Sequence, residues 1–76
     1  MSSDEEARDI ASRKLIDIYD RAPNGSEKEI EAILALGGTG NKLAVEKLKD
    51  IYDRAPNGSE KEQAAIRALG KIGRQS

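Results

Sequence analysis

Thirteen consecutive residues occur twice in this chain, and this duplication constrains the fold more than any other feature. Residues 17–29 read DIYDRAPNGSEKE, and residues 50–62 repeat them without a change. When residues 8–40 are laid over residues 41–73, 22 of the 33 positions are identical. Self-similarity at a period of this length is typical of repeat proteins, in which one supersecondary unit stacks on the next. The chain is therefore predicted to contain one structural unit used twice.

The first part of each unit is predicted to be a long helix. In the first copy, apolar residues recur at steps of three and four, which places them on one side of a helix. They are Ala7, Ile10, Ala11, Leu15, Ile18, Tyr19 and Ala22. This helix should begin near Asp4 and run to about Ala22.

A turn and a short helix follow. The Pro-Asn-Gly sequence of residues 23–25 disfavours continued helix and tolerates positive φ. Ser26 followed three residues later by Glu29 matches a capping box, which marks a helix start. The short helix should stop at Gly37, with its core side centred on Ile33 and Leu36.

The second copy predicts the same elements over residues 42–55 and 59–69, with Gly70 and Gly73 ending the regular structure. Its short helix should turn Ile66 and Leu69 to the core. The expected fold is all-α, with four helices as two tandem antiparallel helix-turn-helix repeats, a short alpha-solenoid. We expect a single domain over residues 1–76, with repeat 1 at 3–40 and repeat 2 at 41–73.

The composition argues against catalysis and against metal or cofactor binding. The chain has no His and no Cys, so the commonest general base, nucleophile and metal ligands are missing. Its carboxylates are expected on outer helix faces beside Lys or Arg at helical spacing, as solvated ion pairs. We predict no catalytic residue, no cofactor, no metal site and no small-molecule ligand.

Charge and hydropathy argue against two further classes of partner. The net charge is −1, and no apolar run is long enough to cross a membrane. Acids interleave the six bases that could form a patch for nucleic acid: Lys42, Lys47, Lys49, Lys61, Arg67 and Lys71. Tyr19 and Tyr52 lie on the apolar stripes, so each is expected in the core with its hydroxyl at the rim. We predict no nucleic-acid or membrane partner, and a soluble, cytoplasmic location on recombinant expression.

The duplicated unit resembles computationally designed helical repeat proteins, which reuse an idealised unit with a Ser-x-x-Glu capping box, Gly-rich closing loops and charged outer faces. Residues 26–29 and 59–62 carry that box, and the resemblance covers residues 3–73. The Trp and Gly-Tyr signature of tetratricopeptide repeats is missing. The resemblance implies an artificial scaffold with no natural compartment, chosen for folding or assembly.

Differences between the copies mark positions whose surroundings differ. Three positions are apolar in the first copy only: Ile16, Ile30 and Leu34 stand where the second copy has Lys49, Gln63 and Arg67. Ser12 and Glu31 are polar where the second copy has Val45 and Ala64. One interpretation is the capping of a two-repeat stack, in which the outer edge of each copy is polar.

The long helix fits capping less well, because Ser12 and Ile16 lie one turn apart and changed in opposite directions. We therefore predict a self-association surface of Ile16, Ile30, Leu34 and Ser12. Residues 1–40 carry five bases against nine acids, and residues 41–76 carry eight against five, which favours a head-to-tail contact. The expected function is a cyclic homo-oligomeric scaffold, with a trimer as the specific expectation. The alternatives are a capped monomeric two-repeat solenoid or a small module that binds a protein or peptide.

Overall fold

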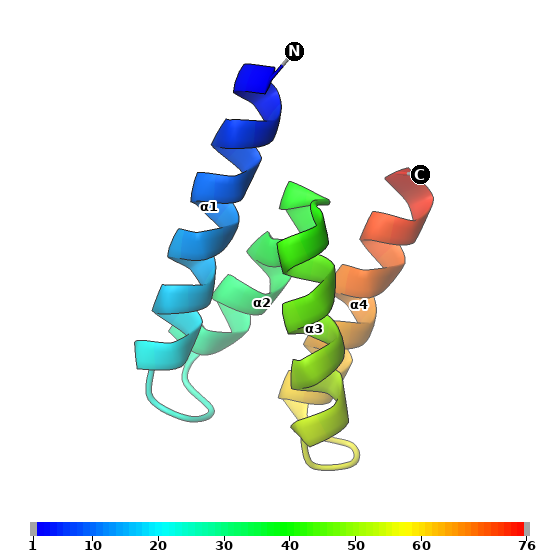
Figure 1. Ribbon diagram of the computed structural model, residues 1–76. Helices are drawn as coiled ribbons and strands as arrows, with labels where there is room; N and C mark the ends of the chain where they lie inside the picture. The colour runs from blue at the N-terminus through cyan, green and yellow to red at the C-terminus, as the bar shows by residue number, and fades with distance from the viewer. Residues whose placement is uncertain (1, 76) are drawn as a thin grey trace.

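The computed structural model describes residues 2–75, which form four helices in two antiparallel pairs (Figure 1). The first pair is α1 (Ser2–Arg21) and α2 (Glu27–Thr39), and the second is α3 (Lys42–Arg54) and α4 (Glu60–Gln75). α1 and α3 form one layer, and α2 and α4 form the other. The predicted all-α fold of two tandem helix-turn-helix units is confirmed.

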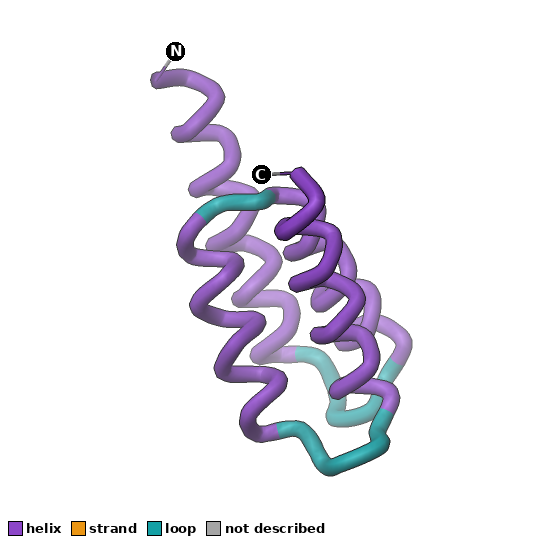
Figure 2. The backbone as a smooth tube through the Cα atoms, turned by 90° about the vertical axis from the view of Figure 1, so that its right-hand side faces the viewer, coloured by secondary structure: helices purple, strands orange, loops and turns teal. Residues whose placement is uncertain are grey.

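The connections lie at two opposite ends of the molecule. The two Pro-Asn-Gly turns are at one end, whereas both chain ends and the loop between α2 and α3 are at the other (Figure 2). Gly25 has φ 81° and Gly58 has φ 82°, the left-handed conformation that glycine adopts at little cost. The repeated sequence therefore makes the same turn twice.

Each short helix begins with the cap that the sequence predicts, but the glutamate reaches one residue further back. The Glu29 backbone N–H donates to Ser26 Oγ at 3.2 Å, and Glu29 Oε1 accepts from the Gly25 N–H at 2.8 Å. In the usual capping box the glutamate would accept from the cap residue itself. Glu62 repeats both contacts, with Ser59 at 3.1 Å and with the Gly58 N–H at 2.8 Å.

Three helix ends differ from the predicted ones. α1 begins at Ser2 rather than near Asp4. α2 does not stop at Gly37 but continues to Thr39, and it closes at Gly40, which has φ 64°. α4 continues past Gly70 and Gly73 to Gln75. Glycine is a weak helix former but does not forbid a helix, so packing against neighbouring helices can override its propensity.

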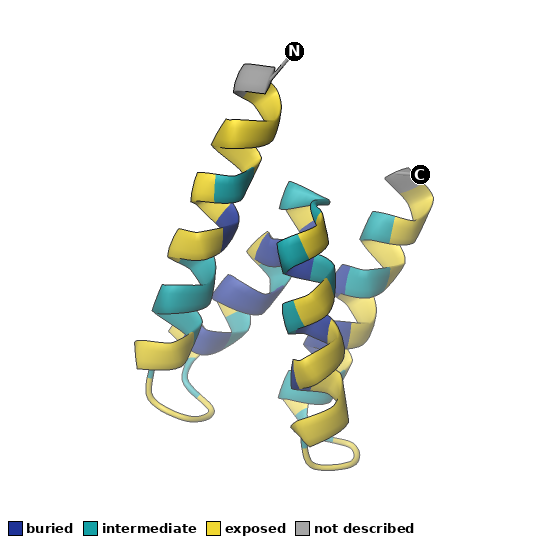
Figure 3. Cartoon of the chain, viewed as in Figure 1, coloured by how far each residue is buried: buried dark blue, intermediate teal, exposed yellow. Residues whose placement is uncertain are grey.

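The core lies between the layers and is shared by the two repeats. Ile33, Leu36, Leu48 and Ile51 are at most 2% exposed, and Figure 3 shows the buried positions on the facing sides of the helices. The smaller buried side chains are Ala32, Ala44, Ala64, Ala65 and Ala68.

The prediction that Ile66 lies in the core is wrong. Ile66, the counterpart of Ile33, is 50% exposed, and Leu69 is half-buried although its counterpart Leu36 is fully buried. Repeat 2 covers Ile33, whereas no part of residues 2–75 covers Ile66 in the same way.

The most extensive contact between helices is that of α2 with α4. It depends on Gly37, which is buried against α4. A Cβ at Gly37 would lie 2.8 Å from Ala68 Cα and 2.9 Å from Ala68 Cβ. The absence of a side chain at position 37 therefore lets the two short helices approach backbone to backbone.

Candidate functional site

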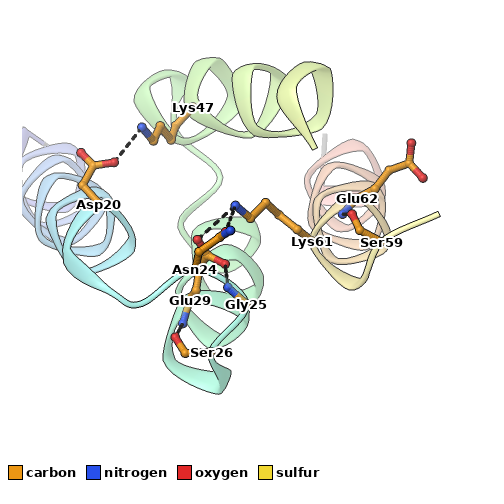
Figure 4. Close-up of polar contacts among 9 residues, drawn as sticks. All are labelled: Asp20, Asn24, Gly25, Ser26, Glu29, Lys47, Ser59, Lys61 and Glu62. Atoms are coloured by element: carbon orange, nitrogen blue, oxygen red, sulfur yellow. Dashed lines mark hydrogen bonds and ion pairs between the residues drawn. The ribbon is translucent and has the colours of Figure 1, made fainter. Parts of the chain in front are cut away.

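A buried ion pair joins the two repeats. Lys61 Nζ of α4 lies 3.1 Å from Glu29 Oε2 of α2, and the side chains are 20% and 5% exposed respectively. The other Glu29 oxygen accepts from the Gly25 N–H, so both carboxylate oxygens have partners. Figure 4 shows the Lys61 side chain reaching across the gap between the repeats.

Lysine side chains of repeat 2 contact three further residues of repeat 1. Lys61 Nζ donates to Asn24 Oδ1 at 2.9 Å, and Lys47 Nζ donates to Asp20 Oδ1 at 3.0 Å (Figure 4). The two ammonium groups also lie over the Tyr19 ring. The distance from Nζ to the ring centroid is 5.2 Å for Lys47 and 5.5 Å for Lys61. These distances permit cation–π attraction. We call Tyr19, Asp20, Asn24 and Glu29 the lysine-binding face of repeat 1.

The environment of Lys61 favours its charged form. Burial by itself would lower the pKa of an ammonium group, but interactions with the Glu29 and Tyr19 side chains raise it. The pKa of Lys61 ends above its ordinary value of 10.5. Lys61 therefore carries its positive charge into the contact at neutral pH.

The expectation that all carboxylates form solvated pairs on outer faces is wrong for Glu29. It holds for pairs such as Asp17 with Arg21 and Asp50 with Arg54, which are exposed i,i+4 contacts at 3.0 Å. Sequence spacing shows only partners on the same helix, whereas Lys61 comes from the other repeat. The weak signal for the pair was that Glu29 and Lys61 both belong to the thirteen-residue identity.

Repeat 2 carries the counterparts of the lysine-binding face, but within residues 2–75 no lysine pairs with them. Tyr52, Asp53, Asn57 and Glu62 correspond to the lysine-binding face, and Tyr52 is 42% exposed. The prediction of a core tyrosine therefore holds for Tyr19, which packs against the core, and is wrong for Tyr52. Lys14 and Lys28, the counterparts of Lys47 and Lys61, are exposed and form no ion pair within residues 2–75.

Ser12 does not belong to an outer surface, because it is fully buried. Its Oγ lies 2.9 Å from Thr39 Oγ1 and 2.8 Å from Asn41 Oδ1, and its single proton can go to one of them at a time. Asn41 also caps α3 by accepting from the Ala44 N–H at 3.0 Å and donates to Asp9 at 3.1 Å. Ser12 is polar because it fastens the inter-repeat loop to α1. Its predicted place in a self-association surface is thus wrong.

Replacing Ser12 by alanine should lower the free energy of unfolding by about 1 kcal/mol, because it removes a buried hydroxyl from this network. Chemical denaturation would measure the loss. Combining Ser12→Ala with Thr39→Val should cost less than the two single changes together, since the two hydroxyls share one contact. Strictly additive losses would show that the hydroxyls act independently.

The three apolar residues of the predicted surface are half-buried and pack against the core. Leu34 lines a shallow hollow with Arg67, Ala68, Lys71 and Arg74 of α4. It therefore faces repeat 2. The counterparts Lys49, Gln63 and Arg67 are exposed.

The arrangement joins helices of the two repeats. Within residues 2–75 no three carboxylates are grouped as metal ligands would be, and every buried side-chain polar atom has a hydrogen-bond partner. None of the described helices combines the length and the apolar content needed to cross a bilayer. Comparison with protein-family models, with curated proteins and with solved structures found no match for this chain.

Proposed function

We propose that this chain is a non-catalytic structural scaffold of the designed helical-repeat class, and that it self-associates through the two ends of its stack. The observation that carries the proposal is the contrast between Ile33, which is fully buried, and Ile66, which is 50% exposed. The two residues are identical and occupy the same place in the unit. An apolar side chain retained at an uncovered position favours a further surface stacking against it.

The proposed contact lies outside the self-association surface that the sequence predicts. Ile30 and Leu34 are already packed against the core of their own chain, so they offer less apolar area to a partner. Ile16 is half-buried against the same core. The exposed end of repeat 2 offers Ile66 and Tyr52 instead.

A capped monomer is the second candidate, and a specific observation favours it. Gln63 and Arg67 replace Ile30 and Leu34 at the exposed end of repeat 2, and Glu31 replaces Ala64 at the exposed end of repeat 1. These residues lower the apolar area of both ends. Because Ile66 and Tyr52 are not replaced, the capping is incomplete, and we propose a weak association rather than none.

A contact between opposite ends of the stack is heterologous. It leads either to a closed ring of at least three chains or to an open array, depending on the rotation between neighbours. The cyclic trimer expected from the sequence is one member of this set.

Solution mass decides between self-association and the capped monomer. We expect the weight-average mass from light scattering to rise above the chain mass of 8.2 kDa between micromolar and millimolar concentration. Ile66→Lys should hold it at the monomer value by placing a charge in the contact. A wild-type mass that stays monomeric at millimolar concentration contradicts the proposal.

The matched variant is Ile16→Lys, which introduces the residue that the second copy has at that position. If the patch of Ile16, Ile30 and Leu34 makes the contact, Ile16→Lys will lower the mass and Ile66→Lys will not. If the exposed end of repeat 2 makes the contact, Ile66→Lys will lower the mass and Ile16→Lys will not.

A further inference from the structure

We propose that two copies of this chain dock head to tail, with repeat 1 of one copy stacking on repeat 2 of the other as the repeats stack within one chain. This inference rests on the proposed self-association and names its surfaces. The partner is a second copy because the chain already contains both halves of the contact, one at each end.

The polar groups that join the two repeats within the chain have counterparts at its exposed ends: acceptors at the end of repeat 2 and lysines at the end of repeat 1. The lysine-binding face recurs at the exposed end of repeat 2 as Tyr52, Asp53, Asn57 and Glu62. Within the chain, Lys47 binds Asp20 and Lys61 binds Glu29 and Asn24. By the same geometry, Lys14 of a second copy would reach Asp53, and its Lys28 would reach Glu62.

The apolar half is present in part, since Gln63, Arg67 and Glu31 stand where the internal contact has Ile30, Leu34 and Ala64. Ala44 and Ala68 of repeat 2 are buried, yet their counterparts Ala11 and Ala35 in repeat 1 are exposed. At the other end, Ile66 is exposed where Ile33 is buried. Small side chains on one end thus match a large one on the other, as they do inside the chain.

The close approach of the short helices can also be repeated. Gly70, the counterpart of Gly37, is exposed, and a Cβ there would meet nothing within 4 Å in the isolated chain. In a head-to-tail pair it would meet Ala35 of the second copy, as a Cβ at Gly37 would meet Ala68. At Gly70 an added methyl group should therefore help the monomer and block the pair.

Charges at the junction are complementary. The stacking would bring the first turn of α1, with Asp4 and Glu5, next to the last turns of α4, with Lys71 and Arg74. Acids at a helix N-terminus and bases at a helix C-terminus also suit the two helix dipoles. Since the exposed pairs are screened by salt, the association should weaken as ionic strength rises.

The first test is Gly70→Ala, with mass and thermal unfolding measured on the same sample. We expect association at least about tenfold weaker than wild type, because overpacking of a close helix contact is costly. The thermal midpoint of dilute protein should rise, since alanine is a better helix former than glycine. Unchanged association would overturn the head-to-tail geometry, because that geometry leaves no room for the methyl group.

The second test is charge reversal. Lys14→Glu and Asp53→Lys should each weaken association by about fivefold at low salt, and the double variant should recover it, because the reversed charges then meet across the junction. Arg21→Glu is the control: its side chain and that of its counterpart Arg54 are both 81% exposed, so stacking does not touch this position. A double variant that associates no better than the singles would overturn the Lys14 and Asp53 pairing.

The outcomes separate this inference from the proposed function. If wild type is monomeric at all concentrations, self-association itself fails. If wild type associates but Gly70→Ala and the charge reversals leave it unchanged, self-association stands and the head-to-tail contact is wrong.

Discussion

Gly37→Ala should lower the free energy of unfolding by about 2 kcal/mol, because the new methyl group would lie inside the contact distance of Ala68 on the facing helix. The clash involves backbone as well as side chain, with Ala68 Cα at 2.8 Å and Ala68 O at 3.0 Å from the added Cβ. α2 and α4 would have to separate along their main contact. For a domain of this size the thermal midpoint should fall by roughly 10 °C.

The matched control is Gly70→Ala at the equivalent position of repeat 2. No atom lies within 4 Å of a Cβ there, so the variant should gain about 0.5 to 1 kcal/mol from helix propensity. The sign of the change should thus be opposite for the same substitution in the same sequence context. Adding Ala68→Gly to Gly37→Ala should rescue only part of the loss, because the backbone contacts remain. Equal effects at the two glycines would show that the close approach is not limiting.

Glu29→Ala should cost between about 2 and 3 kcal/mol, because it removes two interactions at once. The Gly25 N–H loses its acceptor, and Lys61, whose side chain is 20% exposed, loses its counter-charge. Removing one partner of a buried ion pair is costly because it leaves an uncompensated charge. The partial exposure of Lys61 lets water reach it, which keeps the cost below that of a fully buried pair.

Glu62→Ala separates the two contributions. Glu62 makes the same contact with the turn as Glu29, accepting from the Gly58 N–H at 2.8 Å, but it has no ion pair within the described residues. Its loss should therefore cost about 1 kcal/mol, the value of a helix cap. Urea unfolding of dilute monomer would measure both variants. If the two losses are equal, the Lys61 pair adds nothing to stability.

The secondary structure was largely readable from local patterns. The turn residues Pro23, Asn24 and Gly25, the cap at Ser26 and the apolar steps around Ile33 are local signals, and helices respond to local signals. The ends of α2 and α4 were missed for the same reason. Gly37 and Gly70 indicate helix ends by propensity, but Gly37 is buried against α4, and Leu69 and Ile72 on either side of Gly70 pack against the core, so both helices continue.

The candidate site could be predicted only in part. The differences between the copies indicate where the surroundings differ: Ile30 packs against the core and Leu34 lies beside α4 of repeat 2, while Gln63 and Arg67 are exposed. The prediction for Ser12 is wrong because its partners, Thr39 at the end of α2 and Asn41 at the start of α3, lie far along the chain. Differences between the copies do not indicate the lysine-binding face, because its residues are identical in both copies.

The amino-acid sequence by itself determined that this protein is two copies of a capped helix-turn-helix unit, since caps, turns and apolar periodicity act over a few residues. Only the tertiary structure decided that Ile33 is buried and Ile66 is exposed, and that Glu29 holds a lysine while Glu62 does not. Within the repeated unit these residues are identical, so no local property can distinguish them. The difference arises because, within residues 2–75, repeat 1 has another repeat packed on that side and repeat 2 does not.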